Sequence, residues 1–456
     1  FERGGMRVLI IGTGYVGLNT GVMLAYLGND VTCIDLNQEK VKRLQAGEVT
    51  IFEPHLDELF AEVHQKMHFV SDYAQADIPN QDVIFIAVNT PSLADGNADL
   101  SYVRMAAESI AENLGEKFVV IVNKSTVPIG SGNWVEAIIR EHYFEVRNAK
   151  PNGLFNVVSS PEFLAQGAAL HGSFYPDRII IGSEHEPSIE RLKELFGPII
   201  RQDFEAPACL PRPAGLSEVP MLVCDVTSAE MVKYAANSFL ALKISFINEI
   251  AQLTQKIGAD VSAIAKGIGL DKRIGDRFLD AGIGWGGSCF GKDTAALVAT
   301  AKDYHLDMPI IRAARDVNYA QRVWVVDRLQ EELKILKGKH IALLGFSFKP
   351  NTDDLRDAPS LDISRLLVQR GAIVRAHDPV ALDNARSQYP NLGITYSESL
   401  EFTLDSADAI VLITEWPIYR ELNWESIPPV PVIDGRNFLD RDRLTKLGFT
   451  VIGIGR

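Results

Sequence analysis

The 456-residue sequence has few cysteines, an excess of negative charge and no long apolar segment. Its four cysteines are too few and too scattered for a disulfide framework or a zinc site, so we expect no metal ligands. A formal net charge of −14 argues against a broad surface for nucleic acid or anionic membrane, but not against local basic pockets for phosphate. Because no apolar run reaches the length of a membrane span and no signal peptide is visible, we expect a cytoplasmic protein without a membrane partner.

The apolar and charged contents, 46% and 23%, are those of an ordinary globular protein, and the length predicts two or three domains. The first segment has the order strand, glycine turn, helix, strand, acid. We predict a strand over residues 7–11, a helix over 18–27 and a strand over 31–34 that ends at Asp35. The glycine turn supplies the candidate cofactor ligands Gly12, Gly14, Tyr15, Val16 and Gly17.

This order is typical of a dinucleotide-binding fold. The glycines admit a pyrophosphate to the N-terminus of the helix, and the acid accepts a hydrogen bond from the ribose 2′-hydroxyl. Because Asp35 would repel a 2′-phosphate, the predicted cofactor is NAD rather than NADP. Lys40, five residues further on, either reaches the cofactor or is a solvated residue of the next helix.

Three more predicted strands, over residues 82–88, 118–122 and 156–159, end in polar or proline-containing loops. Ligands of open α/β sheets bind beyond the carboxyl ends of the strands, so these loops are expected to face the cofactor. Taken singly, each is equally well an ordinary proline-terminated loop. The candidate ligands in these loops are Thr90, Pro91, Ser125, Thr126, Glu162, Phe163, Leu164 and Gln166.

A cysteine stands in a glycine-rich stretch that runs from Gly286 to Asp293, with the sequence GGSCFGKD. A helix is predicted over residues 294–301, which places Cys289 near a helix N-terminus. The helix dipole and the neighbouring Lys292 both favour a thiolate, which is the nucleophilic form of cysteine. The alternative is a glycine turn around a small packed cysteine.

Residues 227–257 form a long helical pattern without proline, with Ser228 as a plausible N-cap. A helix of this length is expected to join two domains or to form a dimer seam. Lys233 and Asn237 are four residues apart and therefore share one face of it. From the spacing alone, they are more often a solvated pair than a functional one.

The last third repeats the α/β pattern, with strands predicted over residues 339–345, 373–376, 408–414, 431–434 and 450–454. The turn after the first of these strands lacks GxGxxG, so a nucleotide other than NAD is expected here. Phe348 can pack against a base, while Lys349, Arg356 and Arg436 can pair with phosphates or carboxylates. Taken singly, any one of them is more often a surface charge than a ligand. Between the two α/β parts, residues 204–220 contain four prolines and are predicted to form a surface loop.

The motifs GTGYVG, VNTP, KSTVP, PEFL, EMVKYAANSF, RIG, GGSCFGKD, GFSFKPNTDDLRD and DGR follow one another in this order. With them, the chain closely resembles the nucleotide-sugar 6-dehydrogenases over nearly its whole length. The resemblance implies oxidation of a sugar primary alcohol to a carboxylate with two NAD and one water. UDP-glucose is the favoured substrate; the alternatives are GDP-mannose or a UDP-N-acetyl-hexosamine. A nucleotide-binding regulator without turnover and a simple two-electron dehydrogenase are the competing classes.

The resemblance also implies an α/β protein with two Rossmann-like domains with parallel sheets, joined by a long central helix and a helical middle region. The expected boundaries are 6–203 for the NAD-binding domain, 204–220 for the surface loop, 221–335 for the central helical domain with the cysteine loop, and 336–456 for the UDP-binding domain. A homo-oligomer is expected, with a dimer formed through the central helix.

By resemblance, Cys289 adds to the aldehyde formed in the first oxidation, and the thiohemiacetal becomes a thioester. Lys233 and Asn237 stabilise the negative oxygen of the tetrahedral species. Water then hydrolyses the thioester, and the residues expected to position or activate it are Asp293, Thr126 and Glu162. Gln166 stands where the family commonly has a second glutamate, so only ligand contact is expected of it.

The remaining assignments also come from the resemblance. Arg273 is expected to reach the substrate site of a neighbouring subunit. The expected cofactor ligands, beyond the glycine turn, are Asp35, Lys40, Thr90, Pro91, Ser125, Thr126, Gln166, Lys292 and Arg356. The expected substrate ligands are Glu162, Phe163, Leu164, Lys233, Asn237, Arg273, Ile283, Gly284, Gly286, Phe348, Lys349 and Arg436.

Overall fold

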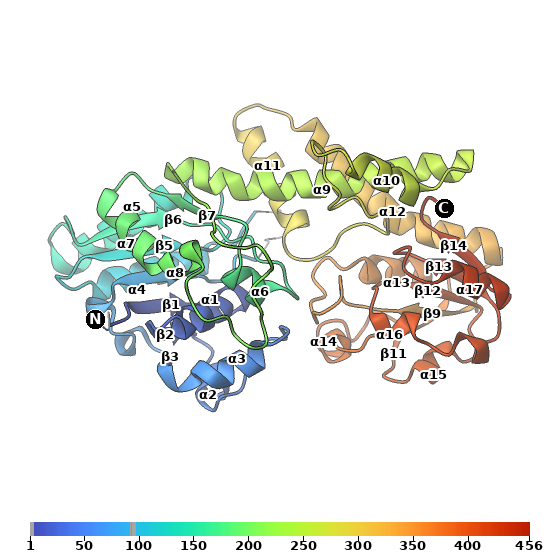
Figure 1. The fold of residues 1–456 in the computed structure, drawn as a ribbon, viewed down its shortest axis with the longest axis horizontal. Coiled ribbons are helices and arrows are strands. Elements are labelled where there is room, and N and C mark those ends of the chain that lie inside the picture. Colours follow the sequence, from blue (N-terminus) through green and yellow to red (C-terminus); the bar gives the residue numbers. More distant parts are fainter. Residues whose placement is uncertain (1–3, 92, 94–96) are drawn as a thin grey trace. The chain divides into compact units, whose positions relative to one another are not determined.

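The structure is a computed structural model that describes residues 4–91, 93 and 97–456. The chain divides into two compact units, with the boundary between Ala235 and Ala236 (Figure 1). This boundary falls inside the long helix α9, Val226–Ile257, which therefore contributes residues to both units. Among the described residues, none of the helices combines the length and the apolar character that crossing a bilayer requires.

The first unit is built around a mixed sheet with the strand order β3-β2-β1-β4-β5-β6-β7-β8. Neighbouring strands are parallel except at the β6–β7 pair, which is antiparallel. The strands are β1 Arg7–Ile11, β2 Asp30–Ile34, β3 Met67–Val70, β4 Val83–Ile86, β5 Val119–Asn123, β6 Phe155–Ser159, β7 Ile179–Gly182 and β8 Met221–Cys224. The helices are α1 Tyr15–Tyr26, α2 Gln38–Gln45, α3 Leu56–Val63, α4 Ser101–Asn113, α5 Ser131–Arg147, α6 Ala169–Phe174, α7 Glu186–Leu195 and α8 Gly197–Arg201.

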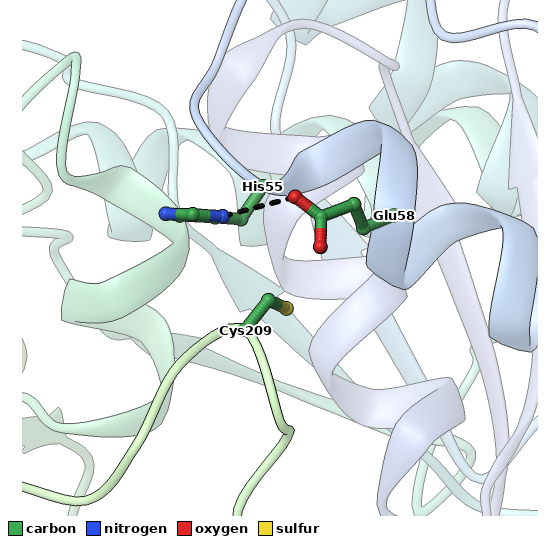
Figure 2. Close-up of side chains that lie close together, drawn as sticks. All are labelled: His55, Glu58 and Cys209. Carbon is green, nitrogen blue, oxygen red and sulfur yellow. Dashed lines mark hydrogen bonds and ion pairs between the residues drawn. The ribbon is translucent and has the colours of Figure 1, made fainter.

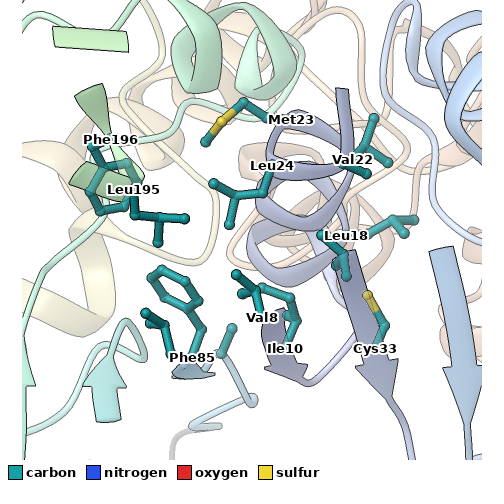
Figure 3. Close-up of a cluster of buried hydrophobic side chains, with 14 of the residues drawn as sticks. Val8, Ile10, Leu18, Val22, Met23, Leu24, Cys33, Phe85, Leu195 and Phe196 are labelled. Atoms are coloured by element: carbon teal, nitrogen blue, oxygen red, sulfur yellow. The ribbon is translucent and has the colours of Figure 1, made fainter. Parts of the chain in front are cut away.

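Both faces of this sheet are buried, because successive side chains of a strand point to opposite faces. On one face, Val8 and Ile10 of β1 belong to the same core cluster as Leu18 and Val22 of α1 (Figure 3). The alternate residues of β1 and β4 belong to a second core cluster with the apolar residues of α4 and α5. The carboxyl ends of β1, β4 and β5 are thus held side by side in a rigid layer.

The second unit contains a parallel sheet with the strand order β11-β10-β9-β12-β13-β14. The strands are β9 His340–Leu344, β10 Ile373–His377, β11 Thr395–Tyr396, β12 Ala409–Leu412, β13 Pro431–Asp434 and β14 Thr450–Gly453. The helices are α10 Val261–Gly269, α11 Phe290–Asp303, α12 Pro309–Leu333, α13 Pro359–Gln369, α14 Leu382–Gln388, α15 Leu400–Leu404, α16 Pro417–Arg420 and α17 Arg441–Lys446. Two core clusters cover the two faces of the sheet, and one of them includes apolar residues of α9 and α12.

The predicted fold class, two α/β parts with parallel sheets and a long helix, is confirmed, with one antiparallel junction that the sequence did not indicate. The prediction of Ser228 as the N-cap of the long helix is wrong. The helix begins at Val226, and the carboxylate of Asp225 accepts hydrogen bonds from the backbone N–H of Ser228 (2.8 Å) and from its hydroxyl (2.6 Å). Asp225 therefore caps the first turn, a role that suits its negative charge.

Residues 204–220 contain no helix or strand, as predicted for a loop. The loop is nevertheless attached to the first unit along its length. Tyr26 donates a hydrogen bond to the carbonyl of Glu205 (3.1 Å), and the buried Tyr175 donates one to the carbonyl of Leu210 (2.7 Å). Leu210 itself is buried, so part of this segment belongs to the core rather than to the surface.

Candidate active site

The glycine turn after β1 has the shape that a dinucleotide pyrophosphate requires. Gly12 has φ of +101°, and a Cβ there would lie 2.4 Å from the carbonyl oxygen of Ala87. A Cβ on Gly17 would lie 1.9 Å from the carbonyl oxygen of Gly12. Gly14, at the N-cap of α1, has no side chain with which to cap the first N–H groups of the helix. The turn therefore leaves room and backbone donors for an anion at the helix N-terminus, and it fits the predicted cofactor.

Asp35 follows β2 directly and faces the same turn. Its carboxylate accepts hydrogen bonds from the Thr13 hydroxyl (2.6 Å) and the Asn37 backbone N–H (3.0 Å), and it pairs with the ammonium of Lys40 at 3.0 Å. Burial acts to raise the pKa of Asp35, but these hydrogen bonds and Lys40 outweigh it and hold the pKa below its usual value. The ammonium of Lys40 thus contacts the acid that is predicted to bind the ribose, which favours the interpretation that Lys40 reaches the cofactor.

The loops after β4 and β5 are joined to each other. Thr90 donates its hydroxyl hydrogen to the carbonyl of Thr126 (2.8 Å), and Ser125 donates to the carbonyl of Val88 (2.9 Å). The neighbouring Pro91 is exposed. These loops lie at the carboxyl edge of the sheet because β4 and β5 are parallel neighbours.

Lys233 and Glu162 form a buried ion pair within the first unit. Their charged atoms are 3.0 Å apart, and each side chain is 5% exposed. Lys233 also donates to the backbone carbonyl of Glu162 at 2.5 Å, and the Leu164 backbone N–H donates to the Glu162 carboxylate at 2.6 Å. The interpretation of Lys233 as part of a solvated pair is therefore wrong.

The residues after Glu162 connect this pair to the glycine turn. Tyr15 donates its hydroxyl hydrogen to the carbonyl of Leu164 (3.2 Å). The ring of Phe163 has the guanidinium of Arg178 3.6 Å from its centre and the ammonium of Lys233 5.6 Å from it. In the loop that follows, the side-chain oxygen of Gln166 is buried and has no hydrogen-bond partner among the described residues.

A small cavity borders this ion pair in the first unit. Its lining includes Thr126, Lys233 and two residues that the sequence analysis did not select, Asn123 and Lys124. Burial lowers the pKa of Lys124 to about 8; the Glu162 carboxylate opposes this shift, and the Lys233 ammonium adds to it. Both polar side-chain atoms of Asn123 are buried without a hydrogen-bond partner in the described part of the chain. The cavity thus presents polar groups that a ligand or water can satisfy.

Cys289 occupies the N-cap position of α11 in the second unit. The predicted position near a helix N-terminus is therefore confirmed, but the helix begins at Phe290 and not at residue 294. Its sulfur is half-buried and lies 3.6 Å from the hydroxyl of Ser288. One turn into the helix, the buried carboxylate of Asp293 accepts a hydrogen bond from the side-chain amide of Asn237 (2.6 Å). The N-terminus of α11 therefore combines a thiol, an amide and an acid in one place.

The cysteine loop packs against the turn that follows β9. A Cβ on Gly286 would lie 2.5 Å from the carbonyl oxygen of Asp357, and one on Gly287 would lie 2.8 Å from the ring of Phe348. Gly287 also has φ of +89° and donates its N–H to the carbonyl of Arg356 (2.8 Å). Both glycines are therefore required for the close approach of the two segments.

Arg436, after β13, lies beside residues 283–284. Its guanidinium donates to the carbonyl of Gly284 (3.0 Å), and the N–H of Ile283 donates to the carbonyl of Gly435 (3.0 Å). Burial lowers the pKa of the Arg436 guanidinium, and the Glu415 carboxylate 3.5 Å away opposes this shift. At the neighbouring turn, the ammonium of Lys349 lies 5.4 Å from the centre of the Phe348 ring. The second unit thus gathers most of its predicted substrate ligands around the cysteine loop.

Two predicted residues, Arg273 and Arg356, pair with acids close to them in sequence, and a third, Lys292, lies within the cysteine stretch. Arg273 is 89% exposed and pairs with Asp271, its neighbour two residues before. Arg356 pairs with Asp354 and is half-exposed. Lys292 lies in the first turn of α11, three residues after Cys289.

Several residues that hold these groups in place were not predicted from the sequence. Lys124 directly follows a strand that was predicted, so its position could have been noticed. Arg178 and Arg322 gave no signal, because an arginine in a loop or a helix is usually solvated. Arg322 is 3% exposed and binds the carboxylates of Asp357 (2.9 Å) and Asp362 (2.8 Å).

Comparison with known proteins decides the family. The NAD binding domain of the UDP-glucose/GDP-mannose dehydrogenase family matches residues 6–200, its central domain residues 227–320, and its UDP binding domain residues 342–441. The chain belongs to this family. The resemblance inferred from the motifs is therefore confirmed, and the predicted NAD cofactor is confirmed by the first of these domains.

Relatives in this dehydrogenase family match along almost the whole chain. UDP-glucose 6-dehydrogenase YwqF of Bacillus subtilis is 40% identical over 99% of this chain and 98% of its own. UDP-glucose 6-dehydrogenase of Rhizobium meliloti is 41% identical over 99% of this chain and 100% of its own. Among solved structures, a UDP-glucose dehydrogenase from Pyrobaculum islandicum matches with a TM-score of 0.87 and 36% identity, covering 99% of this chain and 98% of that one.

Proposed function

We propose that this protein oxidises the C6 alcohol of UDP-glucose to the carboxylate of UDP-glucuronate. The balanced reaction consumes the alcohol, two NAD⁺ and one water and yields the carboxylate, two NADH and three protons. The observation that carries this proposal is the Cys289 thiol at the start of α11, with the Asn237–Asp293 pair beside it. A simple alcohol dehydrogenase has no use for a nucleophilic thiol, whereas oxidation of an aldehyde through a thioester requires one. The full-length identity to UDP-glucose 6-dehydrogenases supports the substrate.

The first unit provides the binding groups for NAD, which when bound supplies the hydride acceptor for both oxidations. Gly12, Gly14 and Gly17 admit the pyrophosphate, and Asp35 accepts a hydrogen bond from the adenosine ribose. The remaining proposed cofactor contacts are Tyr15, Val16, Lys40, Thr90, Pro91, Ser125, Thr126, Gln166, Lys292 and Arg356.

Cys289 holds the carbon that is oxidised. Its sulfur adds to the aldehyde carbon to form a thiohemiacetal, and loss of a second hydride converts this to a thioester. The dipole of α11 and the ammonium of Lys292 favour the attacking thiolate. Hydrolysis breaks the C–S bond, so the thiol is regenerated after each turnover.

Lys233 and Asn237 stabilise the oxyanions of the tetrahedral species. They lie one turn apart on α9, and both side chains are buried, where a hydrogen bond to charge is stronger than in water. The Glu162 partner of Lys233 is the candidate base for hydrolysis, and Asp293 and Thr126 position the water. Their hydrogen bonds in the structure fix the side chains of Glu162 and Asp293 before substrate arrives.

The nucleotide is bound by the second unit. Phe348 offers a ring, and Lys349 and Arg436 offer cationic groups for the diphosphate, next to residues Ile283, Gly284 and Gly286. For the chain as a whole we propose the boundaries 6–203, 204–220, 221–335 and 336–456 as the NAD-binding, loop, central and UDP-binding parts.

The deciding experiment measures NADH formed per mole of nucleotide sugar for UDP-glucose, GDP-mannose and UDP-N-acetyl-hexosamines. The proposal predicts two NADH per UDP-glucose and far slower reaction of the others. One NADH indicates a two-electron dehydrogenase, and none indicates a binding protein. Either of these results contradicts the proposal, as does a higher kcat/KM for GDP-mannose or a UDP-N-acetyl-hexosamine.

We also propose that the enzyme is a cytoplasmic homodimer that pairs through α9. Four apolar residues of this helix, Phe239, Phe246, Leu253 and Ile257, are 60%, 47%, 57% and 66% exposed. Their spacing of seven, seven and four residues places them on one helical face. The exposed Arg273 is then free to enter the partner's substrate site, so monomers are expected to be nearly inactive.

Light scattering of Phe246→Asp tests the dimer. The variant is expected to have the mass of one chain and little activity. Phe144→Asp serves as the control, because it makes the same change at a 50% exposed phenylalanine on another helix, α5. A single-chain mass for a fully active parent protein rules the dimer out.

A further inference from the structure

His55 and Glu58 lie together at the start of α3, on the surface of the first unit. His55 is the residue before the helix, with φ of +66°, and its Nδ1 is 3.2 Å from a carboxylate oxygen of Glu58. The hydrogen-bond distance shows that the His55 ring folds back over the first turn of the helix, where Glu58 lies. Figure 2 shows both side chains directed to the same side of α3.

Cys209 faces this pair from the loop 204–220 (Figure 2). The ligand atoms of His55, Glu58 and Cys209 all lie within 4.8 Å of one another. The position of the thiol is fixed by its neighbours: the N–H of Leu210 donates to the carbonyl of Pro207 (3.0 Å) and closes a turn, and Tyr175 holds the Leu210 carbonyl. The thiol is therefore presented to α3 by an anchored turn.

Imidazole, thiolate and carboxylate are the three ligand types that bind Zn²⁺ in proteins. With zinc–ligand bonds of about 2.0–2.3 Å, ligand atoms around a tetrahedral ion are roughly 3.3–3.8 Å apart. The distance of 3.2 Å between the His55 and Glu58 ligand atoms already lies close to this range. Ligand atoms that are as far as 4.8 Å apart must approach each other by about 1 Å to bind one ion. Because the His55 and Glu58 side chains are 45% and 61% exposed, they can rotate to make it.

The charge around the thiol favours a cation. The carboxylates of Glu58, Glu62 and Asp57 all act electrostatically on the Cys209 sulfur. These three acids give the surroundings of the sulfur an excess of negative charge. A bound divalent ion compensates this excess of negative charge and replaces the thiol proton.

We propose that His55, Glu58 and Cys209 bind a thiophilic divalent cation, Zn²⁺ in the first instance, that fastens the loop 204–220 to helix α3. Water completes the tetrahedral coordination, since the chain supplies three ligands. The expectation that the cysteines are too scattered for a zinc site overlooked this arrangement, because it counted cysteines and not mixed ligand sets. The inference does not rest on the proposed enzymatic function.

The test uses full-length, reduced, metal-free protein titrated with Co²⁺, whose absorption reports thiolate ligation, followed by displacement with Zn²⁺. We expect one thiolate-bound Co²⁺ per chain at this site. Cys209→Ser abolishes its absorption band, and His55→Asn, which keeps a residue that tolerates positive φ, weakens binding at least about tenfold. Cys224→Ser is the matched control, being another half-buried cysteine, and Cys289→Ser controls for metal at the proposed nucleophile. Both controls keep the band.

Hydrogen exchange measures the effect on the loop. Zn²⁺ is expected to slow exchange of the amides in residues 204–218 of the parent but not of Cys209→Ser. Cys209→Ser is also expected to keep the parent's dehydrogenase activity, which shows that it is folded. Absence of the band, its persistence in Cys209→Ser, its loss only in Cys289→Ser, or binding without slower exchange each overturns the proposal.

Discussion

The buried ion pair between Lys233 and Glu162 allows stability and catalysis to be tested separately. The perturbation is Lys233→Met, which keeps the length of the side chain and removes its charge. The charged atoms are 3.0 Å apart, and both side chains are 5% exposed. Removing one partner leaves the Glu162 carboxylate buried without its counter-charge. We therefore expect the free energy of unfolding to fall by about 3–5 kcal/mol.

The exposed pair Lys42–Glu39 is the matched control. Its charged atoms are 2.9 Å apart, but the side chains are 67% and 81% exposed. Lys42→Met is therefore expected to change the free energy of unfolding by no more than about 0.5 kcal/mol. The double variant Lys233→Met, Glu162→Gln removes both buried charges and keeps an oxygen that can accept from the Leu164 N–H. It is expected to regain about 1–3 kcal/mol through the coupling of the two sites.

The assay is urea unfolding followed by circular dichroism, together with the rate of NADH formation from UDP-glucose. Turnover should fall by about 10²–10³ in Lys233→Met, because an oxyanion donor is lost, and should not recover in the double variant. The reasoning is refuted if Lys233→Met is as stable as Lys42→Met. The catalytic role of Lys233 is refuted if the double variant regains activity along with stability.

Three further predictions concern the cofactor turn, the cysteine loop and the buried lysine. Asp35→Ala leaves Lys40 free to pair with a 2′-phosphate, so kcat/KM for NADP should rise relative to that for NAD. An equal kcat/KM for the two cofactors in the parent contradicts the role of Asp35. Gly287→Ala brings a Cβ to 2.8 Å from Phe348 and should lower kcat at least about tenfold. Gly258→Ala is the control for backbone strain alone, because Gly258 has φ of +73° and a Cβ there would have no atom within 4 Å. An equal loss of kcat in both variants contradicts the packing argument. The pKa of Lys124 is about 8 in the folded protein, and its usual value is 10.5. Between pH 8 and 10.5 the lysine is therefore protonated in the unfolded chain but not in the folded one. The free energy of unfolding of the parent should consequently rise as the pH increases through this range. Lys124→Met should remove that part of the rise, measured as the difference in urea midpoint between pH 7.5 and 9.5; an identical rise in the variant contradicts the shifted pKa.

Much of the fold followed from local patterns. β1 and β13 begin and end at the predicted residues, because each is a β-branched run bounded by turn residues. β3 and β8 were missed because each has only four residues and lies at an edge of the sheet, and so short a run does not distinguish a strand from a loop. The N-cap of α9 was predicted at the wrong residue because Asp225 and Ser228 are both good N-cap residues. The structure selects Asp225, since β8 ends at Cys224 and the helix begins at Val226.

The site residues that could be predicted are those in loops that directly follow a strand. Parallel strands end at one edge, so loops distant in sequence could be expected to meet, as Thr90 and Thr126 do. The contacts of Arg322 and Arg178 were not predictable, because their burial depends on tertiary packing and not on the local pattern. The same holds for Cys209, which reaches His55 only through the course of the loop 204–220.

The role of Cys289 is tested most directly by counting NADH formed by Cys289→Ser from UDP-glucose. A serine has a similar shape but is a far poorer nucleophile at neutral pH, because its hydroxyl is hardly ionised. The variant is expected to stop at the aldehyde or to accumulate a slowly hydrolysed ester, without repeated formation of two NADH per sugar. Repeated turnover to two NADH per sugar at the parent's rate would show that Cys289 only packs in a glycine turn, and the covalent mechanism would be wrong.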